Sequence, residues 1–255
     1  MPLHIFVTVK FFTCIAYIFF GMSKKIKIFS NVFLSLILVA VFSVSFFPLG
    51  AVTTSVRPDD SPYYYGDRTG KGVSLMFNVY ENAEVVRGIA DLLFKNGVKA
   101  TFFLGGCWAD DNEETIRYLL EKGEEIANHG YFHRDHAKLG AEGNKSEIVN
   151  TEKIINALSG VKTTLFAPPS GSFSKTTLGV AKELGYKTIM WSLDTIDWRD
   201  NDEELIIKRA TGKVKGGDLI LMHPKPHTLS ALQRIIDAIK GKGLTIVTVS
   251  ENLGN

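Results

Sequence analysis

The sequence predicts an α/β fold in which about seven strand–helix units form a barrel. Short apolar stretches typical of strands alternate with amphipathic helices from residue 72 onward, and this alternation indicates a mostly parallel sheet. The number of units favours closure into a barrel, and a chain of 255 residues has the length of one such domain. Polar residues gather directly after the strands, where the active sites of parallel α/β folds lie.

Strands are expected where short runs of apolar and β-branched residues occur, at residues 72–80, 98–106, 124–130, 163–171, 186–194, 218–224 and 244–249. Helices are expected between them at residues 83–96, 112–123, 146–160, 175–184, 202–210 and 228–240. The first helix repeats apolar residues every three to four positions, which turns Val85, Ile89 and Leu92 to one side. Gly123 and Gly160 end two later helices, because glycine is favoured just after the last helical turn.

Residues 1–51 form a hydrophobic N-terminal region that we interpret as a signal peptide or a membrane anchor. Lysines follow Met22, and an apolar stretch then runs from Val32 to Phe47, which is the order found in export signals. Translation is expected to start at Met22, with a two-span hairpin as the alternative, and cleavage near Ala51 is left open. The bulk of the chain is therefore expected outside the cytoplasm, in the cell envelope.

A linker is expected at residues 52–71, where Tyr63, Tyr64 and Tyr65 either cover a groove or pack against the barrel, and residues 72–255 form the main domain. Beyond residue 51 the chain carries 25 basic and 27 acidic residues and no basic block, which argues against a nucleic-acid partner. Cys107 is the one cysteine of this part, and we interpret it as a small buried side chain.

The histidine-rich stretch NHGYFHRDH places His129 and His133 four residues apart, a spacing at which two imidazoles can bind one metal ion. Asn78 ends the first strand, the turn that contains Pro168 follows the fourth, and His223 follows the sixth. Taken singly, these residues have ordinary structural explanations such as strand ends and buried histidines. Their convergence on one end of the barrel indicates a functional site.

These ordered motifs resemble those of the polysaccharide deacetylase family (carbohydrate esterase family 4, the NodB-homology domain) over about residues 70–250. The resemblance implies a distorted (β/α)7-type barrel that removes acetyl groups from a glycan such as peptidoglycan or chitin. It implies that His129 and His133 bind a divalent metal, usually zinc. It also implies that Asp197 orients and charges a histidine and that His223 is the general acid.

Substrate-contacting residues also follow from the resemblance. The motif DTIDW implies that Trp198 lines the acetyl pocket, and the motif APPSG implies contacts from Pro168, Pro169 and Gly171.

The first motif departs from the family pattern. Family members commonly end the first strand with Thr-Phe-Asp-Asp, but this chain reads MFNV, with Asn78 at the position of the base and Val79 at that of the third metal ligand. Ala167 stands where the family has an arginine that steadies the base. An amide cannot accept a proton from water at neutral pH. Three nearby side chains are alternative bases or ligands: Glu81, Asp135 and His136.

Two functions follow as expectations, and a third stays open. The first is an exported, metal-dependent deacetylase of an N-acetylglucosamine-containing wall polysaccharide, attached to the membrane or secreted. The alternative is a catalytically inactive, glycan-binding or wall-associated protein of the same fold, and the third is a hydrolase of another amide. Retention of Asp197 and His223 favours the first function, whereas Asn78 favours the alternative.

Overall fold

The computed structural model describes residues 23–46 and 61–254 of the chain. The described residues fall into two units that are treated separately, with the division after Val56. The first contains one helix, α2 (Lys24–Phe46), which includes most of the predicted apolar stretch. Among the described residues, no helix has both the length and the apolar character needed to cross a membrane. The predicted start at Met22 and the cleavage point near Ala51 lie outside the described residues.

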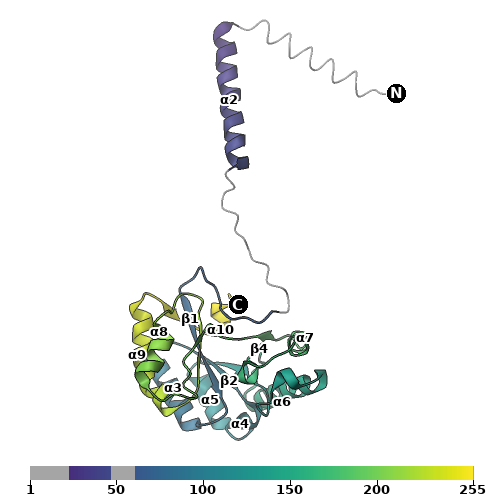
Figure 1. The fold of residues 1–255 in the computed structure, drawn as a ribbon, viewed down its shortest axis with the longest axis vertical. Coiled ribbons are helices and arrows are strands. Elements are labelled where there is room, and N and C mark those ends of the chain that lie inside the picture. Colours follow the sequence, from purple (N-terminus) through teal and green to yellow (C-terminus); the bar gives the residue numbers. More distant parts are fainter. Residues whose placement is uncertain (1–22, 47–60, 255) are drawn as a thin grey trace, which may run out of the picture. The chain divides into compact units, whose positions relative to one another are not determined.

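The second unit is a curled, parallel half-barrel with helices around its outer face, which confirms the predicted distorted (β/α)7-type fold (Figure 1). Its strands are β1 (Gly72–Val79), β2 (Thr101–Leu104), β3 (Glu125–Asn128), β4 (Leu165–Phe166), β5 (Lys187–Thr188), β6 (Leu193–Asp194), β7 (Leu219–Met222) and β8 (Thr245–Ile246). The order across the sheet is β5-β4-β3-β2-β1-β7-β6, and β8 pairs with β1. Every strand pair is parallel.

Helices follow the strands, as the alternating pattern predicts. They are α3 (Ala83–Lys95), α4 (Gly106–Asp110), α5 (Glu113–Glu121), α6 (Ala141–Ser159), α7 (Lys175–Glu183), α8 (Glu203–Thr211), α9 (Pro226–Gly241) and α10 (Val249–Asn252), with short 3-10 turns η1 (His136–Lys138) and η2 (Pro169–Gly171). Helix α3 packs beside α5 and α9, α8 beside α9, and α6 beside α7. The helices therefore form a continuous outer layer over the sheet.

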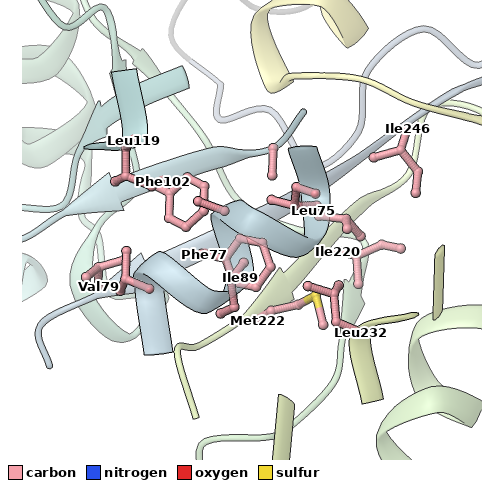
Figure 2. Packing of buried hydrophobic residues seen from close by; sticks show 14 of the residues in the cluster. Leu75, Phe77, Val79, Ile89, Phe102, Leu119, Ile220, Met222, Leu232 and Ile246 are labelled. Atoms are coloured by element: carbon pink, nitrogen blue, oxygen red, sulfur yellow. The ribbon is translucent and has the colours of Figure 1, made fainter. Parts of the chain in front are cut away.

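Strand β1 lies at the centre of the sheet and is buried on both faces. Leu75, Phe77 and Val79 point to the outer layer, where they meet β2, β7 and the helices (Figure 2). Met76 and Asn78 alternate with them and point to the inside of the half-barrel, since successive strand residues face opposite sides. The strand thus places Asn78 inside and Val79 outside.

The strand register brings the carboxyl ends of the central strands level with one another. Asn78 on β1 pairs with Phe103 on β2, and Leu104 on β2 pairs with Asn128 on β3. Loops that leave these ends therefore start from one rim, which is where a parallel α/β fold builds its site.

The segment before β1 is part of the half-barrel from residue 61 onward, although the sequence assigns it to a linker. The Tyr63 backbone N–H donates to the Thr188 carbonyl (2.8 Å), and the Tyr63 carbonyl accepts from Met190 N–H (2.7 Å). Tyr65 forms a bridge with Asp218. The Tyr63 side chain packs against the inner core, so this tyrosine supports the barrel.

Candidate functional site

A cavity of about 440 Å³ opens at the rim, and it collects most of the residues that the sequence singles out. Its described walls are Asn78, His129, His133, Ser170, Trp191, Trp198 and His223. These residues come from the loops and strand ends that follow β1, β3, β4, β5, β6 and β7. None of the seven carries a carboxylate.

Asp197 and His223 form a tightly bonded pair on one side of the cavity. His223 Nδ1 lies 2.8 Å from Asp197 Oδ1, and the backbone N–H of His223 donates to Asp197 Oδ2 (2.8 Å). The Thr228 hydroxyl donates to the same Oδ2 (2.7 Å). Burial raises the pKa of the Asp197 carboxyl, but these hydrogen bonds outweigh it, and the pKa lies below its usual value. Asp197 is therefore an anion that holds the proton on His223 Nδ1 and leaves Nε2 for the cavity.

The loop that carries Asp197 is held in a strained conformation. Ile196 has φ of 56°, a left-handed value that a β-branched residue rarely adopts. Its N–H donates to Asp194 Oδ1 (2.7 Å), and the Thr195 hydroxyl donates to the Leu221 carbonyl (2.8 Å). This turn directs Asp197 inward, 1% exposed, and leaves the neighbouring Trp198 54% exposed at the cavity wall.

His129 and His133 lie on the other side, on the loop after β3. Their ring centroids are 5.6 Å apart and their planes are nearly perpendicular, at 79°. His129 Nδ1 lies 2.7 Å from the Ala167 carbonyl, which can only accept, so Nδ1 carries the proton and Nε2 keeps its lone pair. Burial lowers the pKa of His129 to about 3 and also lowers the pKa of His133. Both imidazoles are thus favoured in the neutral form that a metal ligand requires.

Tyr80 holds this pair of histidines, and the sequence did not single it out. Its hydroxyl lies 2.9 Å from the His129 carbonyl and 2.7 Å from the Gly130 carbonyl, and it accepts from His133 N–H at 3.0 Å. Its ring packs edge-on against His133, at a centroid distance of 4.8 Å, and against His129 at 5.4 Å. A side chain at Gly105 would meet the Tyr80 ring at 2.1 Å, so the tyrosine requires that glycine.

Glu147, on α6, holds the same loop through hydrogen bonds to its backbone. Its buried Oε2 accepts the backbone N–H groups of Tyr131 and Phe132, each at 2.8 Å. The Gly130 N–H donates a further hydrogen bond to Asn128 Oδ1 (2.9 Å). Both residues had a sequence signal. Glu147 is an acidic residue beside apolar positions of a predicted helix, and Tyr80 is an aromatic residue at the end of a predicted strand.

The residues present do not fit a complete catalytic metal centre. Zinc sites that perform chemistry use three protein ligands, and no group of three His, Cys, Asp or Glu residues within the described segments is placed to hold an ion. Val79, at the position of the third ligand, is fully buried in the outer core. The neutral histidine pair supplies two ligands, and we derive no reaction step through a metal.

The alternative bases are engaged elsewhere. Glu81 pairs with Lys225. Asp135 accepts hydrogen bonds from Lys138 (2.8 Å) and from the Ser172 hydroxyl, which hold the pKa of the Asp135 carboxyl below its usual value. His136 is fully buried, with Nδ1 2.7 Å from Asn144 Oδ1. None of these candidates lines the cavity.

The turn after β4 reaches the cavity through a residue other than the predicted ones. Pro168 and Pro169 are buried below the rim, and the wall residue is Ser170, whose φ is 54°. Gly171 leaves room for Trp191, because a Cβ there would lie 2.7 Å from the indole ring. Trp191 is a second wall residue that sequence reasoning missed, although a tryptophan inside a predicted strand was a usable signal.

A parallel half-barrel with a histidine pair and an Asp–His pair around one cavity has the architecture of an α/β-barrel hydrolase. A family model described as polysaccharide deacetylase matches residues 65–189. The chain is 32% identical over 182 residues to a peptidoglycan-N-acetylglucosamine deacetylase of Bacillus cereus, covering 69% of this chain and 66% of that protein. The chain belongs to the polysaccharide deacetylase family, carbohydrate esterase family 4, whose deacetylases are generally metal-dependent.

Other similar proteins include one that is described as a pseudoenzyme. Protein YlxY of Bacillus subtilis is 37% identical over 197 residues, which is 77% of this chain and 61% of YlxY. BA3943, a CE4 family pseudoenzyme from Bacillus anthracis, superimposes with a TM-score of 0.74 at 34% identity, covering 76% of this chain and 69% of that one. A BA3943 mutant described as having restored enzymatic activity also has a TM-score of 0.74. The chain spans less than two thirds of the length of the two curated relatives.

Proposed function

We propose that this chain binds an N-acetylated glycan in the cavity of a polysaccharide deacetylase that has lost its base. The observation that carries the proposal is that no described wall residue has a carboxylate, while an amide, Asn78, ends β1 at the base position. Deacetylation needs a group that takes a proton from water, and an amide has no pKa in the usable range. Glu81 and Asp135 do not replace it, because both are bonded to lysines outside the cavity.

The binding half of the site supports a sugar ligand. Trp191 and Trp198 line the cavity, and flat aromatic rings pack well against the apolar face of a sugar ring. The relatives are named for peptidoglycan N-acetylglucosamine and chitin. The ligand class we propose is therefore a wall-type polymer that contains N-acetylglucosamine.

We place the barrel outside the cytoplasm, in the cell envelope. The lysines after Met22 and the apolar stretch from Val32 onward have the order of an export segment, and peptidoglycan lies in that compartment. Attachment through this segment and zinc as the metal both stay predictions.

Binding is tested by calorimetry with N-acetylglucosamine oligomers and the full chain. Trp198→Ala should weaken binding by about tenfold, since a buried aromatic contact contributes roughly 1 kcal/mol or more. Phe94→Ala is the matched control, because Phe94 is 59% exposed on α3 and does not line the cavity. An equal loss in both variants, or no binding by the wild-type protein, would contradict the proposal.

Slow deacetylation is the second candidate, favoured by the intact Asp197–His223 pair. An imidazole with Nδ1 held by a carboxylate can still protonate a leaving amine. Acetate release from the same oligomers, with zinc or cobalt added, decides between the two functions. Release that disappears in His223→Ala would establish the hydrolase, and no release by folded protein supports the binding function.

A further inference from the structure

Trp198 is the most exposed tryptophan of the cavity wall. It is 54% exposed, so little of the barrel packs around its ring. An indole that turns freely loses side-chain entropy when a ligand packs against it, and this loss weakens binding. A ligand therefore binds more tightly if the protein fixes the ring before the ligand arrives.

The next residue, Arg199, packs on this indole. Its guanidinium carbon lies over the Trp198 ring, 5.8 Å from the centroid, within the range at which an aromatic face attracts a cation. Asp200 holds the guanidinium through two hydrogen bonds, from Arg199 Nε to Oδ1 (2.9 Å) and from Nη2 to Oδ2 (3.0 Å). Such a two-bonded pair restricts both the position and the plane of the guanidinium, which keeps it over the indole.

Asp200 is itself anchored to the barrel. Arg209, on α8, places Nη2 2.7 Å from Asp200 Oδ2 and donates from Nη1 to the Thr195 carbonyl (3.0 Å). The Asp200 backbone N–H donates to the Ile196 carbonyl (2.9 Å). Hydrogen bonds from Arg199 and Arg209 hold the pKa of the Asp200 carboxyl well below its usual value, so it is an anion at neutral pH. A helix of the outer layer therefore fixes the group that covers the indole.

We infer that Arg199 and Asp200 are positioning residues that hold the Trp198 indole ready for the glycan. The guanidinium covers one side of the ring and leaves the remaining surface to a sugar. The inference rests on the proposed glycan binding and adds the residues that preorganise its aromatic contact. An exposed ion pair contributes little to stability, so its loss should release the ring and leave the fold intact.

The first test is NMR relaxation of the Trp198 indole N–H in the full chain without ligand, with the signal assigned by its loss in Trp198→Ala. We expect an ordered indole in the wild-type protein and an order parameter below about 0.6 in Arg199→Gln. Glu204→Gln is the matched control, because it breaks the other exposed two-bonded pair, with Arg234. It should leave the Trp198 signal unchanged.

The second test is calorimetry with N-acetylglucosamine oligomers in a double-mutant cycle. Arg199→Gln should weaken binding about threefold, as expected from the loss of one exposed cation–aromatic contact. In the Trp198→Ala background the same change should have no further effect, because Arg199 acts through the ring. A second threefold loss in that background would show that Arg199 contacts the glycan directly, and it would overturn the inference.

The outcomes separate this inference from the proposed function. Equal indole order in the wild-type protein and in folded Arg199→Gln would overturn the inference and leave the proposed function intact. Wild-type protein that binds no oligomer would overturn both. Circular dichroism establishes folding, and Asp200→Asn, which removes the acceptor of the guanidinium, decides the matter if Arg199→Gln does not fold.

Discussion

Backbone strain at single residues marks the rim. Among the described residues, the non-glycine positions with left-handed φ are Asn82, His133, Ser170 and Ile196. Each lies on a loop that follows a strand, respectively β1, β3, β4 and β6. Such conformations cost free energy and persist where surrounding contacts enforce them, most often at functional sites. The strained residues around the cavity therefore support its assignment as a ligand-binding site.

Ile196→Gly tests this strain. Removing a β-branched side chain from φ of 56° should raise the free energy of unfolding by about 1 kcal/mol, because left-handed geometry costs non-glycine residues roughly 1 to 2 kcal/mol. Urea denaturation measures it, with Ile196→Val as the control that keeps the strain. A loss of stability in the glycine variant would show that the side chain stabilises the loop more than its geometry strains it.

Tyr80→Phe tests the support of the histidine pair. The change removes the hydroxyl that meets the His129 and Gly130 carbonyls and the His133 N–H, and it should lower the free energy of unfolding by about 1 to 2 kcal/mol. Hydrogen exchange at the His133 amide should accelerate with it. Tyr118→Phe, which loses an exposed bond to Asp91, should cost less than about 0.5 kcal/mol. Unchanged exchange at His133 would rule out the proposed support.

At the scale of elements, a buried glutamate joins the starts of strands β2 and β3, at the end of the sheet opposite the site. Glu124 follows α5 and precedes β3, and its Oε2 accepts the Ala100 N–H at 2.7 Å just before β2 begins. Its other oxygen has no partner among the described residues. Burial raises the pKa of Glu124 from 4.5 to about 7.

This acid should make stability depend on pH. Between pH 4.5 and about 7 the folded protein keeps a proton that the unfolded chain releases, so stability falls as pH rises through that window, by up to about 3 kcal/mol. Glu124→Gln should remove this slope, whereas Glu121→Gln on the exposed face of α5 should retain it. Denaturation at pH 5 and pH 8 measures the difference, and an identical slope in Glu124→Gln would contradict the assignment.

Element prediction succeeded where the sequence is periodic and failed where contacts across the fold decide. The amphipathic patterns placed α3, α5, α7, α8 and α9 close to their observed bounds. The expected strand at 186–194 is instead two short strands, β5 and β6, because Met190 pairs with Tyr63 from the distant segment before β1. Helix α6 begins at Ala141 rather than Ser146, and α4 and α10 were not predicted.

Site residues were likewise found where the sequence has an ordered motif and missed where contacts across the fold decide. His129, His133, His223 and Trp198 line the cavity as the ordered motifs suggested. Trp191 and Tyr80 escaped, since their positions depend on Gly171 and Gly105, whose missing side chains admit the two rings. Such close approaches join residues far apart in sequence, so a local pattern can point to an aromatic residue in a strand but not to the place where its ring packs.

At the scale of the whole molecule, the half-barrel has a bonded Asp–His pair on one side of its cavity and an amide, with no carboxylate among the described wall residues, on the other. The Asp197–His223 pair is fully bonded, whereas Asn78 has no partner and Val79 faces the outer core. Metal should therefore contribute little to stability. We expect a chelator to change Tm by less than about 1 °C, because a weak site stabilises only when the metal concentration exceeds its Kd. A larger fall that His129→Ala abolishes would reveal a resident metal.

The central claim, glycan binding without hydrolysis, is tested most directly by carbon NMR with an N-acetylglucosamine oligomer labelled with ¹³C in its acetyl groups. One sample reports both events, since bound acetyl groups shift or broaden and released acetate gives a separate signal. We predict a shifted or broadened acetyl resonance on addition of the full chain, and no acetate signal after prolonged incubation with zinc. Growth of the acetate signal in the wild-type sample, and its absence with His223→Ala, would contradict the account.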